Sequence, residues 1–216
     1  MKLTGLHLLL TYRCNRSCEH CFVWGGPWQR GSMTEAQVKD ILMQARDASS
    51  IGSVWFEGGE PFLHPATLAE GCRAAKTLGF WTGIVSNGFW TRNDGEARDA
   101  LAPLRGLVDK LAVSADEWHW GVRWRDRVGI AERAAEATGI PLSIFTIQPA
   151  PTEAADAPLP GVMYRGRAAQ RLAADVRGQP WESFTRCPHE KLDTPARVHV
   201  DPLGFLHLCQ GLTMGN

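Results

Sequence analysis

Three cysteines lie within eight residues near the start of the chain, in the run Cys14-Asn15-Arg16-Ser17-Cys18-Glu19-His20-Cys21. Cysteine thiolates bind zinc and iron–sulfur clusters, and an ordinary electron-transfer cluster uses four of them. This motif supplies three, which leaves one iron open to the amino and carboxylate groups of a small molecule. We therefore interpret Cys14, Cys18 and Cys21 as ligands of a [4Fe-4S] cluster.

Two other interpretations of the cysteine motif remain open at this point. A structural zinc site tolerates similar spacing, with His20 or a distant cysteine as fourth ligand, but such sites usually come as two paired knuckles. The chain has no second Cys-x2-Cys pair. Free cysteines are also common in hydrophobic cores, although three within eight mostly polar residues argue against that explanation.

The elements that must position these cysteines alternate between strand-like and helix-like segments, which is typical of βα units around a parallel sheet. We expect strands at residues 6–11, 53–57, 80–86, 110–114 and 142–147, with a weaker sixth at 162–165. We expect helices at residues 34–49, 65–78, 95–104, 127–138 and 168–177. An eight-unit barrel needs about 250 residues, so we predict an α/β fold with a partial (β/α)6 TIM-like barrel of parallel strands.

The pattern changes near the carboxyl end of the chain. Residues 149–160 are rich in proline and alanine and resemble a linker. After Pro180 a short β-hairpin is expected, with strands at 198–200 and 205–209 and a turn at Asp201-Pro202-Leu203-Gly204. We predict a core domain at residues 1–179 and a small C-terminal module at residues 180–216.

Unusual residues follow four successive expected strands. The cysteine run follows the first, Glu57-Gly58-Gly59-Glu60-Pro61 the second, Ser86-Asn87-Gly88 the third and Ser114-Ala115-Asp116 the fourth. Each of the last three could merely be a tight turn or a helix cap. In barrels of this kind, however, the chemistry lies at the carboxyl ends of the strands. Their shared position predicts one site.

Together these features resemble the radical S-adenosylmethionine (SAM) superfamily, whose signature is Cys-x3-Cys-x-aromatic-Cys with His20 in the aromatic place. The resemblance implies that Gly58, Gly59 and Glu60 accept hydrogen bonds from the SAM ammonium group. Glycine suits that role because backbone approaches a ligand closely only where no Cβ intervenes. It also implies that the ribose and methionine parts of SAM are bound by Asn87, Ser114 and Asp116, and that Arg167 pairs with the SAM carboxylate.

The C-terminal segment resembles the first part of a SPASM or twitch domain, the auxiliary-cluster module of peptide-modifying members. Cys187 and Cys209 would belong to that module, which continues with more cysteines in the family. Two thiolates do not fill the four positions of an ordinary cluster. The resemblance therefore implies that the module is either truncated in this sequence or vestigial, with His189, His199 or His207 helping to bind a metal. A second iron–sulfur cluster is expected only if the module is completed.

The resemblance implies an oxidoreductase-like enzyme that reductively cleaves SAM at the [4Fe-4S] cluster and forms a 5′-deoxyadenosyl radical. That radical abstracts hydrogen from a substrate, which the resemblance to peptide-modifying members implies to be a peptide. A small-molecule enzyme, an activating enzyme and a non-catalytic zinc or iron–sulfur interaction protein are the alternatives. The implied partner is a one-electron donor such as a flavodoxin or ferredoxin.

Composition and aromatic content add three expectations. Lysine plus arginine and aspartate plus glutamate both number 23, so no basic field predicts binding to nucleic acid or to an anionic membrane. The apolar run Leu6 to Leu10 is too short for a signal peptide or a span, which places the protein in the cytoplasm. Trp55 and Trp81 are expected in the core, whereas five tryptophans just after strands suit either a pocket or lid or the filling of the open mouth of an incomplete barrel. Those five are Trp24, Trp28, Trp90, Trp118 and Trp120.

Overall fold

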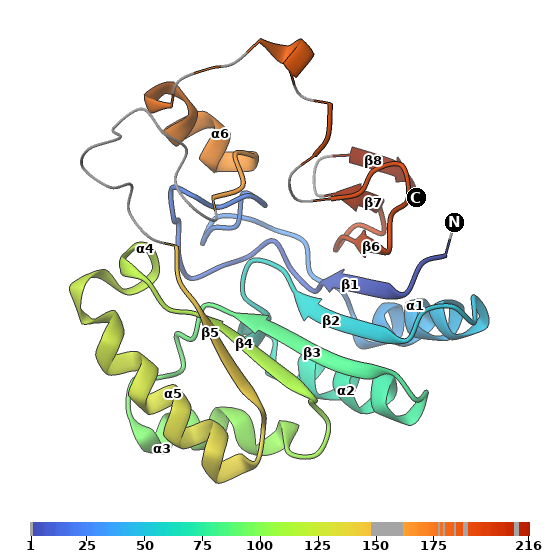
Figure 1. Cartoon of the computed structure of the whole chain (residues 1–216). Coiled ribbons are helices and arrows are strands. Elements are labelled where there is room, and N and C mark those ends of the chain that lie inside the picture. Colours follow the sequence, from blue (N-terminus) through green and yellow to red (C-terminus); the bar gives the residue numbers. More distant parts are fainter. Residues whose placement is uncertain are drawn as a thin grey trace.

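The computed structural model describes residues 2–147, 162–176, 178, 180–183, 185–187, 190–209 and 212–216. It contains an open eight-stranded sheet in the order β5-β4-β3-β2-β1-β6-β7-β8 (Figure 1). The strands are β1 (Gly5–Leu9), β2 (Ser53–Glu57), β3 (Trp81–Ser86), β4 (Lys110–Ser114), β5 (Leu142–Phe145), β6 (Arg197–Val200), β7 (Leu206–Cys209) and β8 (Leu212–Gly215). Strands β1 to β6 pair in parallel, and β7 and β8 extend the sheet antiparallel.

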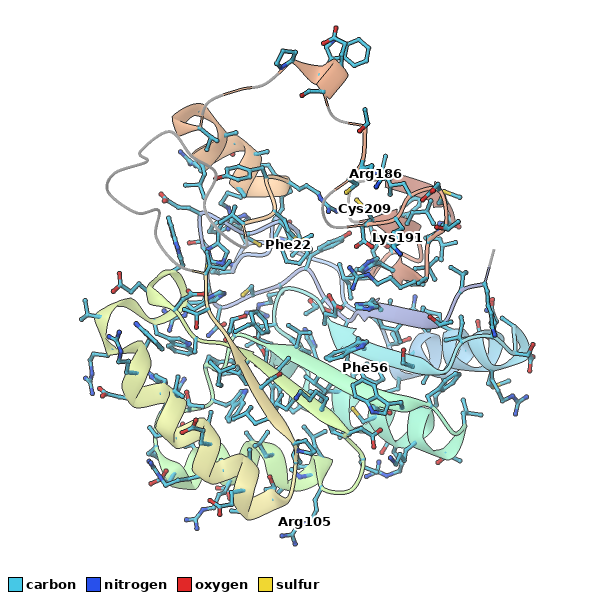
Figure 2. The ribbon with its side chains drawn as sticks, in the orientation of Figure 1. Phe22, Phe56, Arg105, Arg186, Lys191 and Cys209 are labelled. Atoms are coloured by element: carbon cyan, nitrogen blue, oxygen red, sulfur yellow. The ribbon has the colours of Figure 1, made fainter. Side chains whose placement is uncertain are left out.

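Four of the helices cover one face of this sheet (Figure 1). The helices are α1 (Glu35–Asp47), α2 (Pro65–Thr77), α3 (Asp94–Leu101), α4 (Glu117–Trp120), α5 (Trp124–Thr138) and α6 (Gly166–Leu172). Side chains of α1, α2, α3 and α5 form one hydrophobic core with the strands. Phe56 of β2 is fully buried there (Figure 2), and Gly71 of α2 lies so close that a Cβ would stand 2.8 Å from its ring.

The two faces of the central strands differ in chemistry because successive side chains of a strand point to opposite faces. Strand β2 alternates between buried and partly exposed residues. Val54 and Phe56 point into the helix-covered core, whereas Trp55 and Glu57 line a cavity on the opposite face. The sheet therefore presents an apolar face to the helices and a mixed face to the cavity.

The predicted α/β fold with parallel strands is confirmed, but the sixth parallel strand is not at residues 162–165. That segment has no strand; its Val162 packs with Ala168 and Leu172 instead. The sixth strand is β6, which pairs with the free edge of β1 through the registers His7↔His199 and Leu8↔Val200. The pairing of β6 with β1 could not be predicted from local sequence patterns, because the two strands are far apart in the sequence. The residues near β6 indicate only the hairpin turn.

The predicted hairpin is confirmed, since β6 pairs antiparallel with β7. Its strand β6 pairs with β1, so the hairpin continues the main sheet. Asp201 fixes its turn by accepting hydrogen bonds from the amides of Leu203 and Phe205, both at 2.9 Å. The division of the chain at residue 179 stays a prediction, and the expected linker at 149–160 and His189 lie outside the described residues.

The predicted helices are found close to their expected limits. Thr34 caps α1 in a capping box with Gln37. The helix expected at 168–177 is α6, which begins earlier at Gly166 and is followed by a 3-10 turn at Ala173–Asp175; Arg177 is not described. In the described part of the chain, none of the helices combines the length and apolar character needed to cross a bilayer.

Candidate functional site

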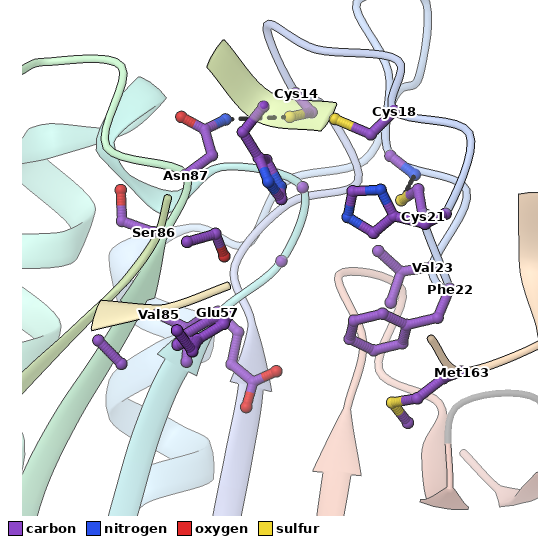
Figure 3. Close-up of a pocket in the computed structure, with 18 of the residues that line it drawn as sticks. Cys14, Cys18, Cys21, Phe22, Val23, Glu57, Val85, Ser86, Asn87 and Met163 are labelled. Atoms are coloured by element: carbon purple, nitrogen blue, oxygen red, sulfur yellow. Dashed lines mark hydrogen bonds between the residues drawn. The ribbon is translucent and has the colours of Figure 1, made fainter. Parts of the chain in front are cut away.

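A cavity of about 620 Å³ lies between the mixed face of the sheet and the loop that carries the cysteines (Figure 3). Cys14, Cys18 and Cys21 line one end of it, as the motif predicted. Glu57 lies at the other end of the cavity, here called the inner end (Figure 3), and its neighbours His7 and His199 also line the cavity. The wall between them includes Phe22, Val23, Val85 and Met163, which are apolar (Figure 3).

The three thiols sit in surroundings that suit cluster ligands. The amide of Arg16 donates to the sulfur of Cys14 at 3.4 Å, and the amide of Gly25 donates to the sulfur of Cys21 at 3.2 Å. Asn87 adds a third donor, with its Nδ2 3.4 Å from the Cys14 sulfur (Figure 3). Such N–H groups stabilise negative charge on sulfur. The donor set therefore fits an iron–sulfur cluster.

The pKa values of the free thiols also favour metal binding. Burial raises the pKa of Cys14 to about 11 and that of Cys18 to about 12, and the charges of the neighbouring cysteines contribute to both. Three thiolates crowded at one end of a cavity are therefore unfavourable without a compensating positive charge. Iron supplies that charge, because a coordinated thiol is deprotonated.

The Gly58-Gly59 pair packs against the backbone that enters the cysteine loop. A Cβ on Gly59 would stand 2.3 Å from the carbonyl oxygen of Arg13, and one on Gly58 would stand 2.4 Å from that of Thr11. The amide of Gly59 donates to the Thr11 carbonyl at 2.6 Å. Both glycines line the cavity, and their binding of the SAM ammonium group stays a prediction. They also support the loop, a role that the motif does not reveal.

Glu60 lies behind the cavity instead of in it. Its carboxylate is fully buried and accepts hydrogen bonds from the Ser86 hydroxyl at 2.9 Å and from the amides of Asn87 and Phe62 at 2.7 and 3.1 Å. These bonds fix the turn after β3. The hydrogen bond from the SAM ammonium group to this carboxylate stays a prediction, and in the described structure the carboxylate bonds to protein groups.

Asn87 and Ser114 both line the cavity, at the carboxyl ends of β3 and β4. Asp116 is nearby but turned away: its carboxylate accepts from the Nδ1 of His119 at 2.8 Å and from the Ile147 amide at 3.3 Å. Burial acts to raise the pKa of Asp116, but the hydrogen bond and charge of His119 outweigh it and hold that pKa below its usual range. Asp116 therefore orients His119, which does line the cavity.

His20 occupies the aromatic place of the cysteine motif and packs edge-on against His119, with ring centroids 4.9 Å apart. Burial, followed by the charge of His119, lowers the pKa of His20 to about 4, so its ring is neutral at pH 7. Within the described residues its Nδ1 has no hydrogen-bond partner. His20, Asp116 and His119 thus form one polar cluster beside the cysteines.

Arg167 holds the cysteine loop from outside the cavity. Its guanidinium donates to the carbonyl of Cys18 at 2.8 Å and to that of Gly25 at 2.6 Å. The side chain is buried, and the preceding Gly166 packs against the Phe22 carbonyl, where a Cβ would stand 2.6 Å away. Pairing of Arg167 with a SAM carboxylate stays a prediction that these bonds do not favour.

Cys187 and Cys209 are both in the described part of the chain. Cys209 ends β7, and its sulfur accepts a hydrogen bond from Arg165, which itself lines the cavity. Burial raises the pKa of Cys209, and the charge of Arg165 opposes this while that of Cys187 adds to it. The two cysteines are therefore neighbours, and their binding of a second cluster stays a prediction.

The sequence analysis missed the inner end of the cavity. His7 stands inside an apolar run, and Trp55 was expected in the core; both face the cavity. A Cβ on Gly83 would stand 2.4 Å from the Trp55 ring, so that glycine makes room for the indole. Trp81, also expected in the core, is 40% exposed. The available signal was a single polar residue, His7, inside the apolar strand β1, and the alternation of Ser53, Trp55 and Glu57 with apolar residues in β2.

Of the two roles expected for the five tryptophans that follow strands, lining the pocket is not found among the described residues. None of the five lines the described cavity. Trp90 is buried and donates to the Ser86 hydroxyl at 3.1 Å, whereas Trp28 is 64% exposed. Trp120 packs against the guanidinium groups of Arg16 and Arg127.

Comparison with known proteins decides among the interpretations of the cysteine motif. The family model described as the Radical SAM superfamily matches residues 8–149. This chain belongs to the radical SAM superfamily. Its cofactors are accordingly a [4Fe-4S] cluster and SAM, and members of the superfamily are enzymes.

Individual radical SAM relatives match about half of this chain. YydG of Bacillus subtilis (strain 168), whose name assigns it to peptide biosynthesis, is 29% identical over 111 residues, or 51% of this chain and 35% of YydG. An S-adenosylmethionine-dependent nucleotide dehydratase of Thermoplasmatales archaeon (strain ISO4-H5) is 33% identical over 115 residues, or 53% of this chain and 38% of the dehydratase. The matched region thus spans about a third of each curated relative.

A solved radical SAM structure shares the fold. BtrN in complex with AdoMet and 2-DOIA superposes with a TM-score of 0.64 at 18% identity, covering 100% of this chain and 78% of BtrN. The likeness extends through the C-terminal strands.

We expect Gly59→Ala to displace the radical SAM cysteine loop, because the added methyl group has backbone atoms of Arg13 in its way. Overpacking of this kind costs about 1–3 kcal/mol, and iron bound after anaerobic reconstitution should fall well below the wild-type amount. Chemical denaturation and iron analysis measure the two effects. Gly52→Ala is the matched control, since nothing lies within 4 Å of the place its methyl group would take; equal iron content in both variants would contradict the role given to Gly59.

Glu60 should give the protein a pH-dependent loss of stability. Burial raises its pKa from 4.5 to about 7 although three hydrogen bonds oppose this. The folded state therefore binds more protons than the unfolded state between these values, so stability falls as pH rises through them. Relative to Glu60→Gln, wild type should lose on the order of 3 kcal/mol across that window.

Urea denaturation of both proteins at several pH values measures this difference in stability. Taking the difference removes the contribution of the other titrating groups, because both proteins share them. Glu132→Gln, at an exposed position of α5, is the control and should show no such trend against wild type. A pH-independent difference between wild type and Glu60→Gln would rule out the raised pKa.

Proposed function

We propose that Cys14, Cys18 and Cys21 hold the [4Fe-4S] cluster and that SAM binds beside them in the cavity, for hydrogen abstraction from a substrate placed farther in. The observation that carries this proposal is the position of the three thiols at one end of a cavity of about 620 Å³. When bound, the cluster supplies the electron for reductive cleavage of SAM to methionine and a 5′-deoxyadenosyl radical. The protein itself binds and orients SAM and the substrate.

Several residues of this chain position the reactants. Arg167 and the Gly58-Gly59 pair hold the cysteine loop, and Asn87 donates to the Cys14 sulfur. Gly58, Gly59, Asn87 and Ser114 line the cavity and are proposed to bind SAM. The apolar wall formed by Phe22, Val23, Val85 and Met163 limits the entry of water, which protects a reactive intermediate.

His119 is the proposed proton carrier of the cavity. Asp116 accepts the Nδ1 proton of His119 in a 2.8 Å hydrogen bond, which leaves the Nε2 of that ring as the atom that accepts or returns a proton. The electron donor is proposed to be a flavodoxin or ferredoxin.

The proposed substrate class is a peptide, which the enzyme modifies as a maturase. YydG supports this choice because its name assigns it to peptide biosynthesis. The dehydratase relative acts on a nucleotide according to its name, so a small molecule is the second candidate. The shared fold does not decide between them, because one scaffold serves many chemistries.

Replacing Cys14, Cys18 or Cys21 by alanine should abolish formation of 5′-deoxyadenosine from SAM under anaerobic reducing conditions. Each change leaves the cluster short of a ligand. Cys72→Ala is the matched control, because Cys72 is fully buried in the α2 core away from the cavity. Chromatography of the products measures the outcome, and undiminished 5′-deoxyadenosine in a motif variant would disprove the assignment.

The substrate class is tested with the reconstituted enzyme and two defined pools, one of synthetic peptides and one of nucleotides. A peptide substrate should raise 5′-deoxyadenosine formation above the basal rate and appear in mass spectra with an altered mass. Acceleration by the nucleotide pool alone would replace the peptide proposal with the small-molecule alternative.

A further inference from the structure

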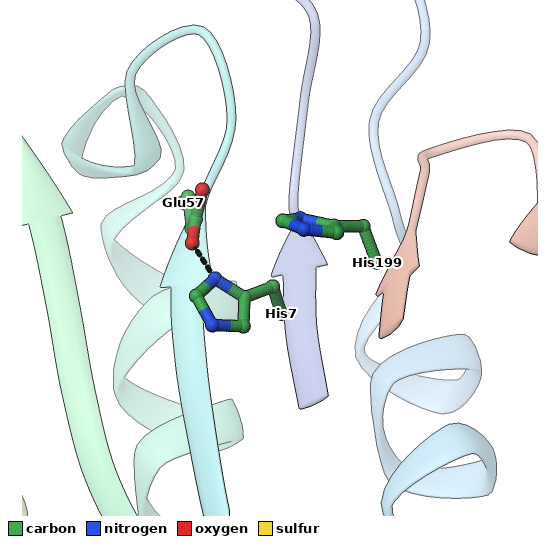
Figure 4. Close-up of side chains that lie close together, drawn as sticks. All are labelled: His7, Glu57 and His199. Atoms are coloured by element: carbon green, nitrogen blue, oxygen red, sulfur yellow. Dashed lines mark hydrogen bonds and ion pairs between the residues drawn. The ribbon is translucent and has the colours of Figure 1, made fainter. Parts of the chain in front are cut away.

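The inner end of the cavity holds a second cluster of ligand-type side chains, His7, Glu57 and His199 (Figure 4). They come from the three adjacent parallel strands β1, β2 and β6. His7 lies opposite His199 in the pairing of β1 with β6, and opposite Trp55 in the pairing of β1 with β2. Aligned residues of parallel strands share a face, so all of these side chains point into the cavity.

The three side chains converge on a small volume. The imidazole rings of His7 and His199 have centroids 4.7 Å apart, and the Nδ1 of His7 contacts a carboxylate oxygen of Glu57 (Figure 4). One ligand atom from each residue lies within 4.8 Å of the other two. First-row metal ions form bonds of about 2.0–2.2 Å to such atoms. One ion therefore reaches all three after small side-chain rotations.

The charges at this end of the cavity favour a cation. His7 and His199 are both buried, and an imidazole binds a metal ion in its neutral form. Glu57 contacts the Nδ1 of His7 and brings a carboxylate to the same place. Arg197 donates to Glu190 at 2.7 Å, so these two charges offset each other and Glu57 supplies a net negative charge.

We propose that His7, Glu57 and His199 form a site for a single divalent first-row metal ion at the inner end of the cavity. Two imidazoles and one carboxylate are the donors that zinc uses in open catalytic sites and that iron(II) uses in facial triads. Such a set leaves coordination positions free, and here they face the cavity that also contains the cysteines. A substrate with an oxygen or nitrogen donor would be held there by the metal ion.

The donor type separates this site from the cysteine sites. All three ligand atoms here are nitrogen or oxygen, whereas Cys187 and Cys209 offer sulfur. Glu190 stands 3.9 Å from the Nε2 of His199, but both of its oxygens bond to Arg197, so it is not assigned as a ligand. Zinc binding can therefore be assigned to one set of residues or the other.

The test uses the full chain with its cluster reconstituted, washed with a chelator and dialysed against zinc. Metal analysis should give one zinc per chain in addition to the cluster iron. His7→Gln, Glu57→Gln and His199→Gln should each weaken zinc binding at least about 10-fold. His64→Gln, at a histidine that bonds to Ser32, and Cys187→Ser are controls that should retain zinc.

X-ray absorption at the zinc edge of the wild-type protein provides a measurement that needs no variant. Nitrogen and oxygen neighbours at about 2.0–2.2 Å are expected, and sulfur neighbours at about 2.3 Å would overturn the site. Absence of zinc from the wild type would also overturn it, as would loss of zinc in Cys187→Ser together with retention in His7→Gln. Iron content reports separately on the SAM-cleaving cluster, so failure of this site and of the proposed function remain distinguishable.

Discussion

The rest of the site depends on one physical constraint: the cysteine loop must be fixed in place although the described residues between β1 and α1 contain neither a helix nor a strand. The loop has a few backbone hydrogen bonds of its own, such as those from the amide of Cys14 to the Gly26 carbonyl at 3.1 Å and from the amide of Tyr12 to the Gly31 carbonyl at 3.2 Å. Groups from other elements add to them. The Gly59 amide binds its entrance, and the Arg167 guanidinium binds two carbonyls near its middle. Buried backbone carbonyls need partners, so the loop and its supports form one unit.

This constraint explains why residues that the sequence motifs assign to SAM binding can instead hold other parts of the site in place. Glu60, Asp116 and Arg167 all stand beside the cavity, and each directs its polar atoms to protein groups: the turn after β3, His119 and the cysteine loop respectively. A buried charged group without such partners would be costly. Their identity is therefore required for the geometry of the site whether or not they touch SAM.

The sequence predicted the parts of the fold that are locally encoded. Strands β2 and β4 were placed at their observed limits, and the cysteines, Gly58, Gly59, Asn87 and Ser114 were correctly expected at one site because strand ends of a parallel sheet meet at one edge. The errors concern long-range pairing and side-chain direction. The partner of β1 on its second edge was not visible in any local pattern, and without it His7 and His199 had no reason to be considered together. Trp55 was misplaced because strand alternation alone does not say which face is hollow.

The pairing of β1 with β6 also affects the order in which the molecule assembles. Residues that flank these strands are separated by 192 positions, as in the bond between Thr4 and Ala196. Contacts of such long sequence separation form late, because the entropy of closing the intervening chain must first be offset. The cysteine end of the cavity needs Arg167 of α6 on its loop, and the inner end needs β6 beside β1. Both ends of the cavity are therefore completed by residues that lie far along the chain from the cysteines.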